Sequence, residues 1–409
     1  MRVRIAVIRR CVAMAALLAC ASERLFAQHD HDMSSMAAPA WMLAFHLNAN
    51  LTFDDQLTKR GDRELGLIDW EMFTASRDVT GGRLELRAMT SLEPLVLGGD
   101  GYPELLQTGG SYRGAVLHDR QHPHNAVMEL AARYFAGPLS LYAGAVGEPA
   151  LGPVAYLHRA SSERDPFAPI GHHWQDASHQ SFGVATIGLR ARALMLEGSV
   201  FNAREADDKH LFLDYRDAKL DSYSGRLTWM PTRALSSSAW WGYIEAHDRL
   251  APDSRMHRYG ASVSFAPRLA PDRAWATTLI WGMNLHHHGG SAHELAHGDP
   301  GASPHHHASS LLAESSAELA GGRTVFGRAE RVMKNGEELG FLGGDLTELY
   351  EVRSFSLGAT QRVAGASRYE LAVGGRGSVN VVPATLLATY GTRTPSGFAV
   401  YLQVLRKHQ

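Results

Sequence analysis

Long stretches of this chain alternate between apolar and polar residues, and this alternation constrains the fold more than any other feature. Every second residue from Tyr259 to Phe265 is apolar, and the same holds from Phe398 to Val404. Successive side chains of a β-strand point to opposite faces, so each stretch predicts a strand with one apolar and one polar face. Strands of a soluble β-sandwich also alternate, but they are usually about five or six residues long. Many stretches here approach or exceed the roughly ten residues of a transmembrane barrel strand.

Short and long connections alternate along most of the chain. Those at 137–138 and 321–322 are short and contain Gly, whereas 96–125 and 148–177 are long. Outer-membrane barrels have short periplasmic turns and long extracellular loops, a pattern that a sandwich does not require. The chain is therefore predicted to be all-β, a single transmembrane antiparallel β-barrel of about 16 strands, within a range of roughly 14–18. The predicted strands are 40–53, 64–77, 82–95, 126–136, 139–147, 178–190, 192–203, 219–230, 234–246, 255–267, 273–285, 309–319, 324–333, 348–362, 367–379 and 396–406.

The N-terminus has the features of a secretory signal peptide at 1–27. Four arginines precede a short apolar run, and no later stretch reaches the roughly 18 apolar residues that a membrane helix needs. An alternative is a lipid-anchored N-terminus at Cys20, because the residues before it resemble a lipobox. After cleavage, 28–39 would be a flexible segment rich in His and Met, followed by the barrel domain at 40–409. The predicted location is the bacterial outer membrane.

The predicted partners follow from that location: outer-membrane lipid and the barrel-assembly machinery. Many barrels end in an aromatic residue that this machinery reads, but this chain ends with Arg406 to Gln409. Either an internal signal around Phe398 and Tyr401 replaces it, or the chain departs from the barrel pattern. The formal net charge is −2, which gives no basic face for nucleic acid.

The chain has 22 histidines, and many of them fall in or beside two neighbouring long loops. Imidazole is a good ligand for zinc and copper, and carboxylates complete such sites. The alternative is a polar plug in which His, Arg, Asp and Glu satisfy one another without a metal. The candidate metal ligands are His122, His124, Glu129, Glu148, His158, His172, His173, Asp176 and His179.

A second group of histidines lies in a low-complexity stretch at 286–308, predicted to be a His-rich loop. Two roles are open for this loop: it chelates transition metals, or it is only a solvated loop of biased composition. The segment from His29 to Met36 adds thioethers to imidazoles, a combination that favours copper.

One short pattern resembles an enzyme motif. His179-Gln180-Ser181 is similar to the His-x-Ser of outer-membrane phospholipases, in which Asn-Gly follows the serine. Here Phe182 and Gly183 follow, and no matching Asn partner is evident, although a catalytic serine needs an oriented base. A surface hydrolase using His179 and Ser181 is therefore a minor alternative, and the chain is predicted not to be an enzyme.

The region from about Gly98 to Phe182 resembles a family of uncharacterised bacterial outer-membrane β-barrel proteins. The shared pieces are 106–109, 119–124, 128–130, 147–153, 158–159 and 172–174. The family usually has Asp at the position of Asn125. The resemblance implies a barrel and, because such proteins accompany copper-handling genes, an association with copper.

These observations give one leading interpretation and one main alternative. The long loops 96–125 and 148–177 are expected to fold into the lumen as a plug and form a His-rich polar constriction, to which Arg159 also contributes. This constriction would pass or capture a small polar solute. A transition metal is the expected solute, with copper as the first candidate, and the expected cofactor is Cu or Zn. The alternative is a plain porin or structural barrel whose plug only braces the wall.

Overall fold

The computed structural model describes residues 40–97, 101–112, 115–204, 219–245, 254–288, 305–341, 348–366 and 368–406. The predicted signal peptide, Cys20 and the segment 28–39 lie outside these residues. None of the helices in the described ranges is long and apolar enough to cross a membrane.

The helical turns are α2 (Glu93–Val96), η1 (Tyr156–His158), α3 (His172–Gln175), η2 (Ala177–His179), η3 (Ala384–Leu386) and α5 (Leu387–Tyr390). The strands are β1 (Met42–Gln56), β2 (Arg63–Val79), β3 (Gly82–Thr90), β4 (Tyr102–Tyr112), β5 (Ala115–Gln121), β6 (Val127–Ala136), β7 (Leu139–Gly147), β8 (Ser181–Ala191), β9 (Leu194–Asn202), β10 (Ser222–Trp229), β11 (Leu235–Glu245), β12 (Ser254–Phe265), β13 (Arg268–Ala270), β14 (Arg273–His288), β15 (His305–Leu319), β16 (Arg323–Asn335), β17 (Leu349–Ala366), β18 (Tyr369–Val381) and β19 (Ser396–Arg406).

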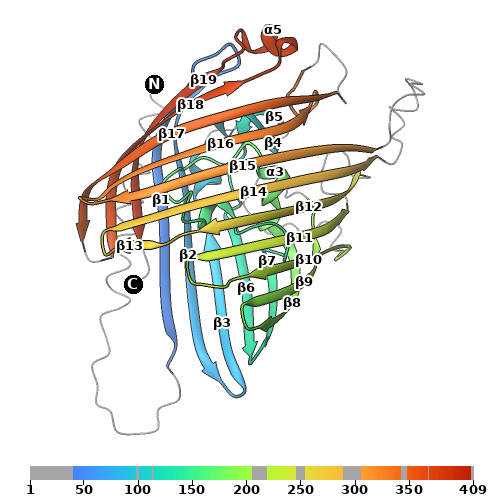
Figure 1. The fold of residues 1–409 in the computed structure, drawn as a ribbon, viewed down its shortest axis with the longest axis vertical. Coiled ribbons are helices and arrows are strands. Elements are labelled where there is room, and N and C mark those ends of the chain that lie inside the picture. The colour runs from blue at the N-terminus through green and yellow to red at the C-terminus, as the bar shows by residue number, and fades with distance from the viewer. Residues whose placement is uncertain are drawn as a thin grey trace.

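Sixteen long strands form one antiparallel sheet that closes on itself (Figure 1). Closure occurs at β1, which pairs with both β2 and β19. Leu51 of β1, for example, lies opposite Leu67 on one side and Leu402 on the other. The remaining member of this sheet, β13, is a three-residue addition that pairs with the start of β14. The predicted all-β barrel of about 16 strands is confirmed.

The two faces of the barrel wall differ as the alternation requires. Outward-facing apolar side chains such as Leu279 and Phe355 are exposed, whereas inward-facing polar side chains such as Thr278 and Glu314 are buried. Polar groups can be buried only where hydrogen bonds or ion pairs satisfy them. The lumen must therefore contain protein that supplies these partners.

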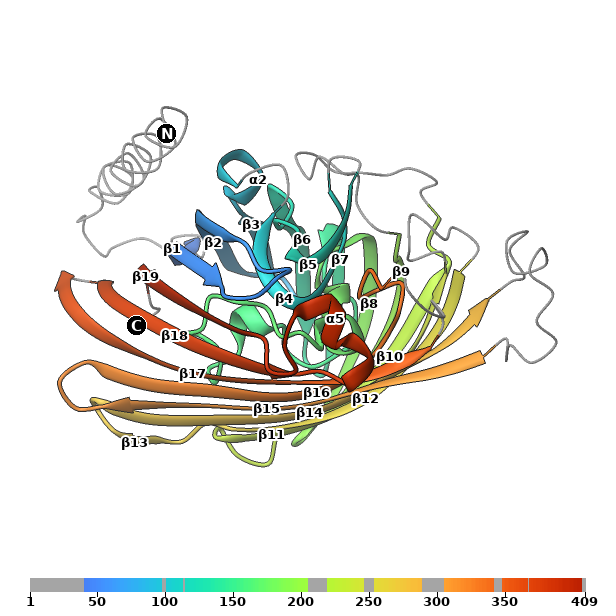
Figure 2. The ribbon, with the colours of Figure 1, turned by 90° about the horizontal axis from the view of Figure 1, so that it is seen from above.

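Short and long connections alternate around the barrel as predicted. The short ones, such as 80–81 and 137–138, lie at one end, which we call the short-turn end, and the long ones lie at the opposite, long-loop end. The described parts of two long connections, 91–126 and 148–180, enter the lumen: β4 and β5 lie inside the ring of strands (Figure 2), and α3 lies against β14 and β15. We call these two connections the plug.

Two details of the first plug connection correct the sequence prediction. The strand predicted to reach residue 95 ends at Thr90, because Pro94 cannot donate to a sheet ladder and α2 forms instead. The loop predicted at 96–125 is not irregular throughout: β4 and β5 pair as a separate two-stranded sheet.

The His-rich loop predicted at 286–308 is also corrected. The backbone of His286 to His288 belongs to β14, and that of His305 to His307 belongs to β15. The two strands continue their antiparallel ladder, with His286 opposite His306, because each backbone supplies the partners that the other needs. Residues 289–304 lie outside the described ranges.

A closed barrel predicts a characteristic behaviour on gels. The sheet has no free edge between β1 and β19, so detergent alone should leave it folded. The unboiled protein should migrate differently from the boiled protein in SDS gel electrophoresis. A single band with unchanged mobility under both conditions would contradict closure of the barrel.

Candidate functional site

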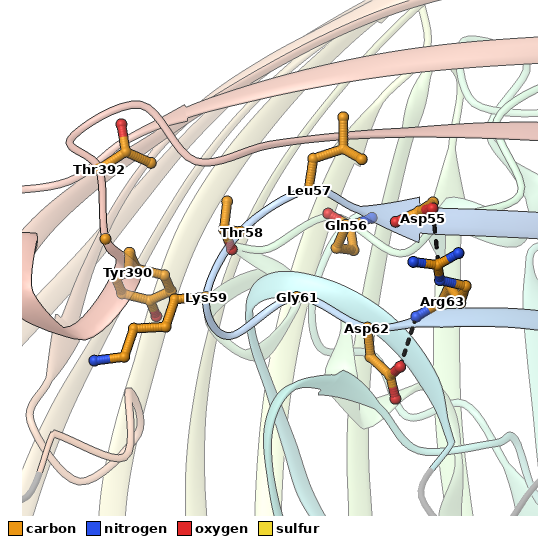
Figure 3. A pocket seen from close by; sticks show the side chains of 11 residues that line it. Asp55, Gln56, Leu57, Thr58, Lys59, Gly61, Asp62, Arg63, Tyr390 and Thr392 are labelled. Atoms are coloured by element: carbon orange, nitrogen blue, oxygen red, sulfur yellow. Dashed lines mark hydrogen bonds and ion pairs between the residues drawn. The ribbon is translucent and has the colours of Figure 1, made fainter.

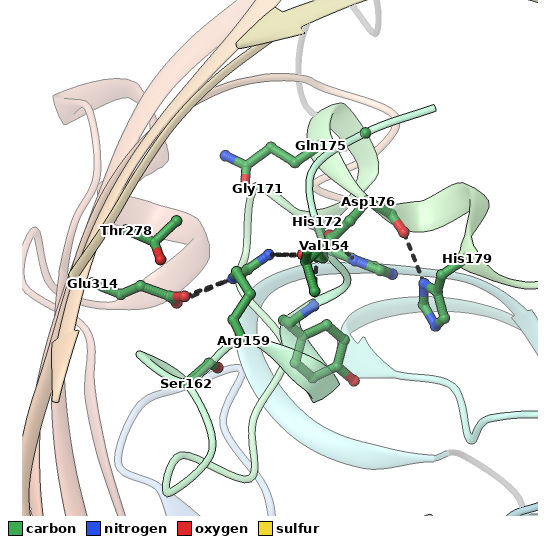
Figure 4. Close-up of polar contacts among 12 residues, drawn as sticks. Val154, Arg159, Ser162, Gly171, His172, Gln175, Asp176, His179, Thr278 and Glu314 are labelled. Carbon is green, nitrogen blue, oxygen red and sulfur yellow. Dashed lines mark hydrogen bonds and ion pairs between the residues drawn. The ribbon is translucent and has the colours of Figure 1, made fainter. Parts of the chain in front are cut away.

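Arg159 fastens the second plug connection to the barrel wall. Its Nε donates to Oε1 of Glu314 on β15 at 2.6 Å, and its Nη1 donates to Oδ2 of Asp176 at 2.7 Å (Figure 4). All three side chains are at most 2% exposed. Breaking one partner of a buried ion pair leaves an uncompensated charge, which costs about 3–5 kcal/mol. Arg159 therefore both holds the plug to β15 and orders the segment around Asp176.

Further ion pairs extend this attachment along neighbouring strands. Arg328 of β16 reaches Glu314 at 3.2 Å and Asp165 of the plug at 3.5 Å, and Arg376 of β18 reaches Asp165 at 3.3 Å. Apolar contacts add to them, since Trp174 packs among buried residues of β15 to β17. The plug is therefore docked on one side of the wall by buried charges and apolar side chains together.

Asp176 also organises two histidines. Its Oδ1 accepts a hydrogen bond from Nδ1 of His172 at 2.6 Å, and its backbone carbonyl lies 2.8 Å from Nδ1 of His179 (Figure 4). The remaining oxygen, Oδ2, also accepts from the backbone N–H of Tyr156 at 2.8 Å. Although burial raises the pKa of Asp176, His172 and Arg159 outweigh it and hold that pKa well below its usual range.

The first plug connection supplies a third histidine, held by a carboxylate that follows β3. Glu93 at the start of α2 accepts the backbone N–H of His124 at 2.7 Å, and both its oxygens lie 3.1 Å from His124 Nδ1. The other ring nitrogen, Nε2, lies 3.1 Å from the hydroxyl of Tyr156. Glu93 is fully buried and also accepts from the backbone of Asp69, so the histidine is tied to β2 as well.

The rings of these three histidines lie together, and we call His124, His172 and His179 the histidine cluster. The ring centroids of His172 and His179 are 5.2 Å apart, and those of His124 and His179 are 5.8 Å apart. In each ring Nδ1 faces an oxygen acceptor. Burial is the main cause that lowers the pKa of His179 to about 3, so this imidazole is neutral near pH 7. Its Nε2 is buried and has no hydrogen-bond partner within the described residues.

The other histidines predicted as ligands adjoin the cluster or lie elsewhere. His122 bonds through Nδ1 to the carbonyl of Pro123 at 2.8 Å, and burial lowers its pKa to about 4. The ring of His173 lies edge-on to that of His172 with centroids 5.6 Å apart. His158 is exposed, and its ring lies edge-on to Trp70 with centroids 4.8 Å apart.

The two predicted glutamates form contacts of a different kind. Glu129 accepts a hydrogen bond from the hydroxyl of Tyr142 at 2.8 Å, and its Oε2 lies 3.6 Å from Nη1 of Arg87. Glu148 lies 3.6 Å from Arg226 of β10. These carboxylates are thus paired with arginines of the wall, a role that sequence spacing could not separate from metal ligation.

Sequence reasoning missed Glu93 and Tyr156. Tyr156 lies between the motif pieces 147–153 and 158–159 but has no ligand side chain of the kind sought, and Glu93 lies outside these pieces. Only the path of the plug brings both residues to His124. The serine of the enzyme-like pattern has local contacts: Ser181 donates to the carbonyl of Ser178 at 3.0 Å, while His179 faces the carbonyl of Asp176.

A separate recess of about 580 Å³ opens at the long-loop end (Figure 3). It lies between the β1–β2 connection and the segment around α5. Its polar lining includes Asp55, Lys59, Asp62 and Arg63, and Arg63 lies 3.8 Å from Asp55. It shares no residue with the histidine cluster.

Comparison with known proteins identifies the architecture. No protein-family model and no curated protein matches the sequence. Among solved structures, a loop-deletion mutant of OmpT, an outer membrane protein of Vibrio cholerae, superposes with a TM-score of 0.50 at 9% identity, covering 90% of this chain and 99% of that one. OmpF of Salmonella typhi, in complex with daunomycin, gives 0.52 at 10% identity, covering 89% and 97%. The chain therefore has the fold of porin-like outer-membrane β-barrels.

Proposed function

We propose that this barrel captures or passes a transition metal ion, copper or zinc, at the histidine cluster of its plug. The observation that carries the proposal is the set of Nδ1 contacts. Glu93, the Asp176 carboxylate and the Asp176 carbonyl each hold one ring of the cluster. Histidines that ligate metals usually donate their other ring N–H to a carboxylate or a carbonyl, which orients the ring and leaves Nε2 for the ion.

The spacing of the rings supports the same proposal. Three imidazoles bound through Nε2 to one tetrahedral ion, at about 2.0–2.1 Å each, have ring centroids roughly 5 Å apart. The centroid distances of 5.2 and 5.8 Å in the cluster are close to this value. Imidazole ligands suit zinc and copper.

Binding would require a small adjustment of the cluster. In the described parts of the chain, no three His, Cys, Asp or Glu side chains already converge on one point as a metal site. The hydroxyl of Tyr156 lies beside His124 Nε2, so it must move aside or become a further ligand. The ion would then draw together rings that already have their outer hydrogen bonds.

Metal binding to the purified barrel tests this proposal. Zinc and Cu(II) should bind the wild type, and His172→Ala or His179→Ala should each weaken binding by more than a hundredfold. Glu93→Gln, which alters the support of His124 and the acceptor of the Asp69 N–H but removes no ring of the cluster, should weaken it by roughly 10–100-fold. His118→Ala is the matched control, because this plug histidine bonds to the carbonyl of Glu338 away from the cluster. Equal affinities in all five proteins would reject the site.

A second function remains a candidate because the buried ion pairs of the plug are complete without a metal. Arg159, Glu314 and Arg328 satisfy one another, as expected for a plug that only braces a porin-like barrel. Conductance in planar bilayers separates the two. Zinc should reduce residual conductance if the ion sits in the plug, and it should have no effect if the plug is purely structural.

A further inference from the structure

Three residues with soft or nitrogen ligand atoms face one another across the first strands of the barrel. His46 of β1 lies directly opposite Met72 of β2, and Met72 lies directly opposite Met89 of β3. Directly opposed residues of antiparallel strands share a face, with Cβ atoms about 4.5–5.5 Å apart. Met89 is buried, so this shared face is the lumen side. The register therefore places two thioethers and an imidazole in one row.

A β-bulge adds a third thioether to this row. Met89 pairs with Glu129 and Thr90 pairs with Val127, so Met128 is an extra residue in β6. A bulge re-aims a side chain that regular alternation would direct to the other face. Met128 is 2% exposed and packs against Met89 and Trp70.

The cluster of buried residues around Trp70 differs in composition from the other apolar clusters inside the barrel. One of them surrounds Met256 with Ile, Leu, Val and aromatic residues, and Met256 is its single methionine. In contrast, the cluster around Trp70 contains Met72, Met89 and Met128, and Leu157 is its one aliphatic member. His158, which is exposed, lies edge-on to Trp70, so the indole is close to accessible polar surface.

We propose that Met72, Met89, Met128 and His46 form a binding site for a soft monovalent cation, Cu(I) or its analogue Ag(I). Uncharged thioethers select Cu(I) over harder ions, and imidazole is compatible with it. The ring of Trp70 adds an attractive face for a cation. We call these four residues the methionine site.

The methionine site is distinct from the histidine cluster and does not depend on it. Met72 lies three residues farther along β2 toward the short-turn end than Asp69, whose N–H binds Glu93 beside His124. Three residues of strand span about 10 Å. The two sites share no ligand, so either can fail while the other binds.

Competition for Cu(I) tests the methionine site on the full-length barrel in detergent. Under reducing, oxygen-free conditions, a chromophoric Cu(I) chelator is titrated against wild type and against the triple variant Met72→Leu, Met89→Leu and Met128→Leu. The triple variant should lose Cu(I) affinity by at least a hundredfold and keep its zinc affinity. Met256→Leu is the matched control, a buried methionine outside the site, and should bind Cu(I) as wild type does. Equal Cu(I) affinity in wild type and triple variant would overturn the proposal.

Two further measurements keep the test decisive. Ag(I) should quench tryptophan fluorescence in wild type, and Trp70→Phe should remove that quenching. X-ray absorption of the wild-type Cu(I) complex should show sulfur in the first shell of the copper, and this needs no variant to fold. A first shell of nitrogen and oxygen alone would place the ion elsewhere and reject the methionine site, whatever the histidine cluster does.

Discussion

Replacing Arg159 with methionine should turn a plugged barrel into a conducting one. The substitution keeps a long side chain but leaves Asp176 without its guanidinium, and Glu314 keeps Arg328 as its ion-pair partner and Ser161 as a hydrogen-bond donor. Removing one partner of a buried ion pair costs about 3–5 kcal/mol, which shifts the ratio of detached to docked plug by a hundredfold or more. Because the barrel ladder itself does not involve this side chain, the wall should remain closed.

Two measurements report this release of the plug. Single-channel conductance in planar bilayers should rise several-fold in Arg159→Met, and protease should cleave the connection 148–180 faster than in wild type. Arg353→Met is the matched control. It removes an ion pair with Glu351 on the exposed outer face, where such pairs contribute about 0–1 kcal/mol. If Arg159→Met retained wild-type conductance and protease resistance, the ion pairs would not hold the plug.

Acid should also loosen the plug of the metal-free protein. Burial lowers the pKa of His122 to about 4 from an ordinary value of 6.5, and the neighbouring His124 and His172 add to this effect. In a detached plug, His122 would therefore bind a proton below about pH 6.5. In the docked plug, His122 would not do so until the pH falls to about 4. Docking is thus favoured above pH 6.5 and loses stability as the pH falls from 6.5 toward 4.

The expected size of the acid effect is about 1–3 kcal/mol, because His122 is only partly buried. Conductance measured with a chelator present should rise between pH 6.5 and 4. His122→Gln cannot take up this proton, so its conductance should depend less on pH over the same range. His118→Gln, altered in the same plug connection, should respond to acid as wild type does. A wild-type conductance that stays constant from pH 7.5 to 4 would contradict this linkage.

The sequence by itself determined the architecture of the wall. A period of two is a local property, so the strands of the wall could be located without knowing any partner, and 139–147 and 396–406 coincide with β7 and β19. The alternation of short and long connections likewise predicted which segments had enough chain to enter the lumen. The histidines of the cluster were also among the predicted ligands, because their side-chain chemistry marks them individually.

Only the tertiary structure decided which of these residues meet. Arg159 and Glu314 are 155 positions apart, and the path of the plug alone brings them together. The same path joins Tyr156 to His124 and leaves His158 against Trp70. The methionine site depends on strand register and on one bulge, and a shift of one residue would turn Met72 or Met89 to the lipid side. Contacts across a barrel are set by register and loop path, which no local pattern of residues encodes.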